Sequence, residues 1–321
     1  MTKQYKVVAI GGGTGLSVLL RGLKKQPLDI TAIVTVADDG GSSGLLRNEL
    51  QIPPPGDIRN VLVALSETEP MFEQLLQHRF ENGNGLSGHS LGNLLIAALT
   101  SITGDFVMGI RELSRILNVK GKVLPAANQS IVLGAVMSDG SIVEGESQIP
   151  KSNKKIERVF LKPRNIEPLP ESIEAIREAD LIVLGPGSLY TSVLPNLLVP
   201  ELAHEIGKAK AKKVYICNVM TQLGETDRFS ASDHVKVLMD HVSDDFLDYV
   251  IVNNTTIPKR IQDRYALEGA RPVMHDKKKL QELGLNIVSD RIIKYDHSVI
   301  RHDEEIVTKW LMSLLPAIKV R

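Results

Sequence analysis

Five short apolar runs, rich in β-branched residues, constrain the fold more than any other feature of this sequence. They cover residues 7–10, 30–36, 181–184, 214–217 and 249–252, and each gives way abruptly to small or polar residues. Near-continuous apolar runs of this length are typical of parallel strands buried on both faces of a sheet. The sequence therefore predicts a sheet of mainly parallel strands.

Amphipathic helical patterns lie between these runs. The most regular one covers residues 91–102, and others cover 16–23, 199–206, 235–242 and 306–314. Their apolar residues recur at the spacing that places them on one face of a helix. Strands that alternate with such helices predict an α/β fold with a Rossmann-like, doubly wound sheet.

Two regions interrupt the alternation. Residues 56–118 have the pattern of consecutive helices, which predicts a helical insertion after the second strand. Residues 131–148 predict a β-hairpin whose turn covers 138–141, because the Asp139-Gly140 pair readily adopts the positive φ of a tight turn. No linker or repeat divides the chain, so we expect residues 1–321 to form a single elaborated α/β domain.

Composition narrows the classes of partner and compartment. The 321 residues contain 38 Lys and Arg against 38 Asp and Glu, so the chain lacks the basic surface expected of a nucleic-acid-binding protein. A single cysteine, Cys217, lies in an apolar run and suggests a buried thiol in a reducing compartment. The apolar runs are too short for a signal-peptide core or a membrane span. We expect a cytoplasmic protein with no membrane insertion.

The loop after the first predicted strand is the first candidate ligand site. Gly11-Gly12-Gly13-Thr14-Gly15 precedes a predicted helix, where glycines permit close backbone approach and free N–H groups attract an anion. Position 16 is leucine, so the dinucleotide fingerprint G-x-G-x-x-G is absent, and no P-loop lysine follows. A tight turn without a ligand is the alternative, but we favour a site formed by Gly12, Gly13, Thr14 and Gly15.

The loop after the second strand carries carboxylates and hydroxyl groups. In doubly wound folds an acidic side chain at this position commonly binds a ribose hydroxyl, which makes Asp38 and Asp39 candidates. The same pair could hold Mg²⁺ through water, although two ligands specify no metal. Ser42 and Ser43 could donate to phosphate, and capping of the next helix is the alternative for this loop.

Two further polar loops follow later strands. Gly187 and Ser188 belong to the loop after residues 181–184, and Asn218, Thr221 and Gln222 to the loop after 214–217. The carboxyl ends of parallel strands share one edge of a sheet, and open α/β sheets bind ligands at that edge. We expect these loops to meet the glycine loop in one crevice that binds a nucleotide-type ligand.

His89 and Asn93 lie where the most regular predicted helix begins, and both are candidate ligand residues. For His89 a capping or structural role is the main alternative. Elsewhere the sequence has no Ser-His-Asp arrangement, zinc-ligand spacing or paired catalytic carboxylates. Catalytic and metal-binding residues therefore stay unassigned.

Taken together, the loop motifs resemble a known family. They are Gly11–Gly15, Ala37–Gly44, Pro54–Asn60, Gly88–Asn93, Gly185–Tyr190 and Asn218–Gln222, in this order. In this respect the sequence resembles the bacterial gluconeogenesis factor family (the YvcK type), a branch of the CofD-like group that includes 2-phospho-L-lactate transferase. The similarity extends over nearly the whole chain.

The resemblance implies a Rossmann-like core, a homodimer and binding of UDP-sugars, chiefly UDP-N-acetylglucosamine. It also implies a regulatory role that links gluconeogenic carbon metabolism to cell-wall precursor supply and cell shape. Tyr265 and Arg301 match the family's ligand-contacting tyrosine and arginine. Arginine suits a diphosphate because its guanidinium donates two parallel hydrogen bonds, and tyrosine could stack on uracil or donate to phosphate.

Three functions compete at this point. The leading one is a non-catalytic UDP-sugar sensor that requires no cofactor and acts through a protein partner, an enzyme that supplies glucosamine phosphate. The second is a Mg²⁺-dependent transferase of the 2-phospho-L-lactate type. The residues 218–226 differ from the corresponding stretch of the transferases, which argues against catalysis. The third, NAD binding, is weaker because the glycine pattern differs.

Overall fold

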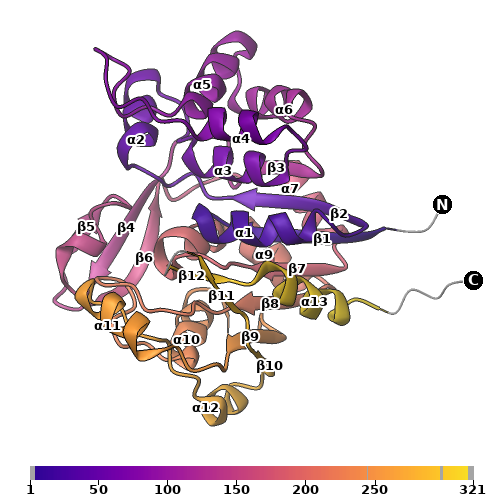
Figure 1. Cartoon of the computed structure of the whole chain (residues 1–321), viewed down its shortest axis with the longest axis vertical. Helices are drawn as coiled ribbons and strands as arrows, with labels where there is room; N and C mark the ends of the chain where they lie inside the picture. Colours follow the sequence, from indigo (N-terminus) through magenta and orange to yellow (C-terminus); the bar gives the residue numbers. More distant parts are fainter. Residues whose placement is uncertain (1–3, 244, 297–298, 317–321) are drawn as a thin grey trace, which may run out of the picture.

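The computed structural model describes residues 4–243, 245–296 and 299–316 (Figure 1). Within these residues seven parallel strands form one sheet in the order β10-β9-β8-β7-β1-β2-β3. The strands are β1 (Tyr5–Gly11), β2 (Leu28–Val34), β3 (Lys122–Pro125), β7 (Leu181–Leu184), β8 (Lys212–Ile216), β9 (Tyr249–Asn253) and β10 (Asn286–Asp290). The chain builds the sheet outward from β1 through β3, then returns to β7 and builds the other half. The predicted doubly wound α/β fold is confirmed.

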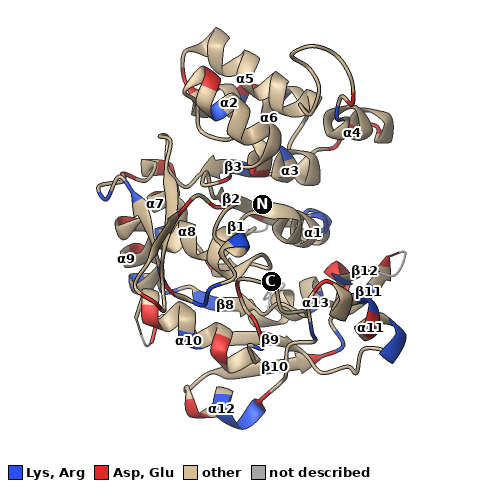
Figure 2. Cartoon of the chain, turned by 90° about the vertical axis from the view of Figure 1, so that its left-hand side faces the viewer, with Lys and Arg blue, Asp and Glu red and all other residues tan. Residues whose placement is uncertain are grey.

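Helices cover both faces of this sheet. On one face α1 (Gly13–Leu23) packs against α3 (Gly56–Leu65) and α13 (Glu304–Leu314). On the other, α7 (Pro170–Glu178) packs against α9 (Pro200–Lys208), and α8 (Leu194–Leu197) and α10 (Ala231–His241) continue that layer (Figure 2). The leucines of α1 at positions 16, 19, 20 and 23 are buried, as the helical spacing predicted. Burial of such a stripe against the sheet drives this layered packing.

A group of helices lies between β2 and β3, at one end of the molecule (Figure 1). It consists of α2 (Gly41–Leu50), α3, α4 (Pro70–Gln77), α5 (Leu91–Thr103) and α6 (Phe106–Ile116). Helical structure therefore begins at Gly41, earlier than the predicted residue 56, because the Gly-Ser-Ser-Gly stretch forms the first turn of α2 rather than an open loop. Among the described residues no single helix is long and apolar enough to cross a membrane; α5 and α6 pass only as a pair bent by 119°.

A second, antiparallel sheet has the order β5-β4-β6, with β4 (Val132–Met137), β5 (Ile142–Glu144) and β6 (Ile156–Lys162). The predicted hairpin is formed by β4 and β5, and Gly140 adopts a φ of +81° in its turn. Its second strand ends at Glu144 instead of reaching residue 148. The chain then passes through a short 3-10 helix, Pro150–Ser152, to the unpredicted strand β6.

The C-terminal third adds further elements beside the main sheet. These are α11 (Lys259–Leu267), α12 (Lys277–Glu282), and an antiparallel ribbon of β11 (Ile293–Asp296) and β12 (Val299–His302). Only Ile293 and Ile300 are buried in these two short strands, so the apolar signal is weak and sequence patterns did not reveal the ribbon. One buried apolar cluster includes residues from the main sheet, the helix group and the antiparallel sheet, such as Ile10, Ile96 and Leu133. The prediction of a single domain remains a prediction.

Candidate functional site

The glycine loop after β1 brings backbone, rather than side chains, to the carboxyl edge of the sheet. A Cβ on Gly12 would lie 2.4 Å from Asp57 Oδ2, and a Cβ on Gly15 would lie 2.4 Å from the Pro186 carbonyl oxygen. Gly13 has a φ of +63°, a conformation that side-chain-bearing residues rarely adopt. The N-cap residue Gly12 provides no side-chain cap, and the Gly13 N–H bonds the Asp57 carboxyl group, so the next N–H groups of the first turn of α1 are available to an anion.

The loop after β7 lies directly beside the glycine loop. β1 and β7 are neighbours in the sheet although they are far apart in the sequence, and the strand order reverses between them. This is the topological switch point at which doubly wound sheets bind ligands. After Ser188, a π-helical turn at Leu189–Val193 carries Thr191 and Ser192 toward the same space.

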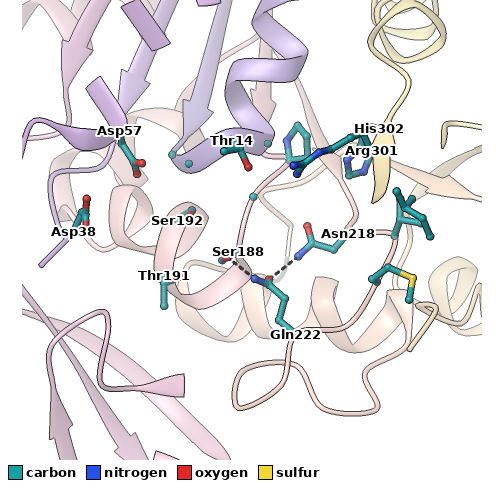
Figure 3. Close-up of a pocket in the computed structure, with 18 of the residues that line it drawn as sticks. Thr14, Asp38, Asp57, Ser188, Thr191, Ser192, Asn218, Gln222, Arg301 and His302 are labelled. Carbon is teal, nitrogen blue, oxygen red and sulfur yellow. Dashed lines mark hydrogen bonds between the residues drawn. The ribbon is translucent and has the colours of Figure 1, made fainter. Parts of the chain in front are cut away.

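A hydrogen-bond chain links this loop to the one after β8. Gln222 Nε2 donates to Ser188 Oγ (2.6 Å), and Asn218 Nδ2 donates to Gln222 Oε1 (3.2 Å) (Figure 3). The three side chains therefore have a fixed mutual arrangement. This arrangement leaves one Gln222 amide hydrogen and the Ser188 hydroxyl proton as possible donors toward a ligand.

These loops enclose a cavity of about 470 Å³, which we call the cleft. Most of the predicted site residues line it: Gly12, Gly13, Thr14, Gly15, Asp38, Gly187, Ser188, Asn218, Gln222, Tyr265 and Arg301. Its size falls within the range of small-molecule sites in proteins. The structure thus brings residues from the first 40 and the last 25 positions of the sequence to one cavity.

Charge is unevenly distributed in the cleft. Asp38 and Asp57 lie at one end, Arg301 and His302 at the other, and Thr14 lies between them (Figure 3). Arg301 is exposed and points its guanidinium toward the space that Thr14 also faces. An anionic group is therefore favoured near Arg301 and the α1 N-terminus, and a group that donates hydrogen bonds is favoured at the carboxylate end.

The carboxylate end includes residues that sequence analysis did not select. Burial and the nearby Asp38 raise the pKa of Asp57 to about 7, against a hydrogen bond with the Gly13 backbone. Burial raises the pKa of Glu146 to about 8, together with repulsion from the carboxylates of Asp38, Glu225 and Asp39. At neutral pH these side chains are partly protonated, so they can donate as well as accept hydrogen bonds.

Four predicted residues lie outside the cleft because they belong to the helix group. Ser42 Oγ and His89 Nδ1 share a hydrogen bond (3.1 Å), and Asn93 Nδ2 donates to the same Ser42 oxygen (3.1 Å). Arg59 Nη1 donates to Asn93 Oδ1 (3.1 Å) and also to Ser90 Oγ. This buried network holds α2, α3 and α5 together. Ser43 is also buried, with its hydroxyl against Gly56.

Asp39 and Thr221 also differ from expectation. Asp39 Oδ1 accepts a hydrogen bond from the Ser147 amide (2.8 Å), so this carboxylate holds the segment after β5 instead of facing the cleft. Thr221 is buried and its hydroxyl accepts a hydrogen bond from the Arg271 amide (3.0 Å). Asp38 Oδ1 accepts a hydrogen bond from the Gly40 amide (2.9 Å) and this side chain lines the cleft, whereas the bond to Ser147 holds Asp39 away from it.

The wall opposite the glycine loop is apolar. Val219, Ile257, Ile293 and Ile300 form a small buried cluster against which Met220, Ile261 and Tyr265 pack. The Tyr265 hydroxyl accepts a hydrogen bond from the Ile300 amide (2.9 Å), which fixes α11 to the β11–β12 ribbon. His302 Nε2 donates to the Cys217 carbonyl oxygen (3.1 Å), and burial lowers the pKa of this histidine. Cys217 itself is buried, as predicted.

Sequence reasoning missed several residues that line the cleft: Asp57, Glu146, Pro186, Thr191, Ser192, Val219, Met220, Ile300 and His302. Asp57 lies within the Pro54–Asn60 motif, so that motif could have identified it. Glu146 follows a hairpin strand, and no local pattern indicates that its segment reaches the cleft. Within the described residues no group of three or more His, Cys, Asp or Glu side chains could hold a metal ion.

Comparison with known proteins agrees with this architecture. Residues 7–293 match the family model of 2-phospho-L-lactate transferase CofD. The gluconeogenesis factor of Bacillus subtilis (strain 168) is 61% identical over 315 residues, which cover 98% of this chain and 99% of the relative. The gluconeogenesis factor of Listeria monocytogenes is 50% identical over 318 residues, with 98% of each chain covered. The crystal structure of a UPF0052-family protein from Bacillus halodurans superposes with a TM-score of 0.95 at 60% identity, covering 97% of this chain and all of the other.

Proposed function

The chain belongs to the CofD family and is similar over nearly its whole length to bacterial gluconeogenesis factors, and from this premise we propose that it is a regulatory protein that binds a nucleotide-sugar, UDP-N-acetylglucosamine, in the cleft. The observation that carries the proposal is the cleft's division into three surfaces. Backbone N–H groups and Arg301 suit a diphosphate, the Tyr265 and Ile300 wall suits a planar base, and the carboxylates suit sugar hydroxyls.

The diphosphate is expected next to Thr14, within reach of the α1 N-terminus and Arg301. A guanidinium is suited to two phosphate oxygens at once, and the uncapped N–H groups add donors without side-chain ordering. Ser188 and Gln222 would then contact the same group from the neighbouring loop. The pyrimidine would lie along Tyr265, and the sugar would extend toward Asp38 and Glu146.

A Mg²⁺-dependent transferase is the second candidate, and the pair Asp38 and Asp57 is the observation that favours it. Their mutual repulsion contributes to the raised pKa of Asp57, and a bound cation would relieve it. Mg²⁺ in nucleotide sites often uses one or two carboxylates together with ligand phosphates and water. These two residues therefore fit such an ion, although the described residues contain no larger ligand cluster. Bound Mg²⁺ would supply neutralisation of phosphate charge.

We favour regulation over catalysis because the relatives at 61% and 50% identity are named for gluconeogenesis rather than for a transfer reaction. In this proposal the protein acts in the cytoplasm as a homodimer and requires no cofactor. It links gluconeogenic carbon metabolism to cell-wall precursor supply and cell shape, through contact with an enzyme that supplies glucosamine phosphate.

The test combines binding with turnover. The purified protein is titrated with UDP-N-acetylglucosamine by calorimetry, and the same mixtures are then analysed chromatographically with and without Mg²⁺. We expect saturable binding and intact ligand. Mg²⁺-dependent consumption of the ligand would support the transferase instead. NAD in a parallel titration serves as the comparison, and tighter binding of NAD than of the nucleotide-sugar would contradict the proposed ligand.

A further inference from the structure

A second cavity, of about 380 Å³, adjoins the cleft on the outer side of α1. Thr14 and Arg301 line both cavities, so they form the boundary between them. The rest of the second wall comes from α1, from the middle of α3, the end of α4 and the start of α13, and from the β11–β12 ribbon, which packs beside α1 (Figure 1). The side chains that matter here are Arg21, Asn60, Gln77 and Lys294.

Three cationic side chains meet around this cavity: Arg21, Lys294 and Arg301. Lys294 pairs with the Glu304 carboxylate, which also lies in the wall. In the ranges that the structure describes, Arg21 and Arg301 form no ion pair. Asp296, the remaining acidic residue of the wall, is itself engaged in an interaction. The cavity is thus lined by three cationic side chains against two carboxylates, and neither guanidinium group is ion-paired among the described residues.

The neutral polar groups of the wall are also set to donate. Arg59 Nη2 donates to Asn60 Oδ1 (2.8 Å), so the Asn60 carbonyl oxygen is occupied and its NH₂ group remains for the cavity. The Thr14 hydroxyl and the Gln77 amide add donors. A wall with two free guanidinium groups and several neutral donors matches an anion that has several acceptor oxygens.

We propose that this second cavity is a phosphate-binding site beside the cleft. Arg21 and Arg301 would hold the phosphate oxygens, with Asn60 and Thr14 as neutral donors. The phosphate belongs either to the ligand that fills the cleft, which would then span the Thr14–Arg301 boundary, or to a separate phosphorylated small molecule bound next to it. Both sources present the same chemistry to these residues. The site shares Thr14 and Arg301 with the cleft, and the spanning ligand rests on the proposed function, whereas Arg21 and Asn60 line only this second cavity.

Arg21→Ala is the test variant. Arg21 is exposed, so its removal should leave the fold intact, which the melting temperature checks. Arg115→Ala on α6 is the matched control, because the Arg115 side chain is 80% exposed and, among the described residues, its ion pair is with Glu112 on the same helix. Calorimetric titrations use inorganic phosphate, alone and with saturating UDP-N-acetylglucosamine, and UDP-N-acetylglucosamine alone.

Arg21→Ala should weaken the binding of one of these ligands by roughly ten- to a hundredfold, which is typical of a lost charged hydrogen bond. Arg115→Ala should bind them like the parent protein. Weaker phosphate binding in the presence of UDP-N-acetylglucosamine identifies a separate phosphorylated molecule. Weaker binding of UDP-N-acetylglucosamine itself identifies a spanning ligand. Parent-like affinity of Arg21→Ala in every titration overturns the site. A third result separates the two proposals. If the parent protein does not bind UDP-N-acetylglucosamine but still binds phosphate in an Arg21-dependent way, the proposed function is overturned and this phosphate site is supported.

Discussion

At the scale of single residues, Gly12 illustrates how tightly the residues around the cleft are packed. Any side chain there would collide with Asp57 Oδ2 and with Thr35 Cγ2, at 2.4 and 2.6 Å from the Cβ. We predict that Gly12→Val destabilises the protein by about 1–3 kcal/mol, typical of overpacking, and also abolishes UDP-N-acetylglucosamine binding. Urea denaturation and calorimetry provide the two measurements.

Gly207→Ala is the control for this substitution, because nothing lies within 4 Å of a Cβ at that helical position. It should leave binding unchanged and stability unchanged or slightly raised, since alanine favours a helix more than glycine does. Parent-like stability and affinity of Gly12→Val would show that Asp57 and Thr35 move aside without cost.

Arg301 is the residue that we expect to contribute most to recognition of the diphosphate. Its side chain is exposed and makes no ion pair among the described residues, so Arg301→Ala should leave the melting temperature of the free protein nearly unchanged. Loss of a charged hydrogen bond, worth about 1.5–3 kcal/mol, should weaken UDP-N-acetylglucosamine binding by roughly ten- to more than a hundredfold. Calorimetry measures the change. Unaltered affinity would show that the β11–β12 ribbon does not contribute to the binding site.

The carboxylates predict how binding depends on pH. Burial raises the pKa of Asp57 to about 7 and that of Glu146 to about 8, so both lose protons as the pH rises through this range. The folded state favours the protonated forms of both side chains. Their contribution to the free energy of unfolding is therefore present at low pH and is lost as the pH rises through the folded-state pKa values. The added negative charge also repels a diphosphate.

We therefore expect the affinity for UDP-N-acetylglucosamine to fall between about pH 6 and pH 9 in metal-free buffer. The double variant Asp57→Asn and Glu146→Gln should flatten this profile, leaving the contribution of Glu225, whose pKa burial raises to about 7. Calorimetry across the range tests this. An affinity of the parent that rises with pH would contradict the expected carboxylate repulsion.

At the scale of secondary-structure elements, the N-terminus of α5 is joined to α3 within the helix group. Ser90 is fully buried, and its hydroxyl accepts hydrogen bonds from the Asn93 amide (3.4 Å) and from Arg59. We predict that Ser90→Ala lowers the free energy of unfolding by about 1–2 kcal/mol, because the helix loses its N-cap and a buried guanidinium loses a partner.

Chemical denaturation followed by circular dichroism measures this change. Ser87→Ala is a suitable control, because Ser87 is exposed in the preceding loop and should shift stability by less than about 0.5 kcal/mol. Equal stabilities of the two variants would show that the Arg59 and Asn93 contacts are replaced by water.

At the scale of the whole molecule, the cleft is lined by both halves of the sheet and by the C-terminal ribbon. A ligand there binds only the assembled fold, so it should stabilise the protein by about 2.7 kcal/mol at one hundred times its Kd. We expect UDP-N-acetylglucosamine at that concentration to raise the melting temperature by several degrees. Differential scanning calorimetry measures the shift, with NAD as comparison. No shift at saturating concentration would contradict a site that joins the two halves.

The sequence by itself determined the layered fold and the loops of the cleft. The apolar runs at 7–10 and 181–184 became adjacent strands, because such runs are stable only when both faces are buried. Gly12 to Gly15 and Ser188 line the cleft because parallel strands align their carboxyl ends. Several elements were not predicted: the edge strands β3 and β10, the strand β6 and the β11–β12 ribbon. Each is short or only partly buried, so its apolar signal in the sequence is weak.

Only the tertiary structure decided which polar side chains face the cleft. Asp38 and Asp39 are adjacent and chemically equal, yet one lines the cleft and the other binds the Ser147 amide. Ser42, His89 and Asn93 are as polar as Ser188, yet they bond to one another between helices. Local sequence fixes a residue's chemistry and its position on an element, but its partners come from elements distant in the chain. A buried polar side chain needs a hydrogen-bond partner, so it faces the protein where a distant element supplies that partner and can face the ligand where none does.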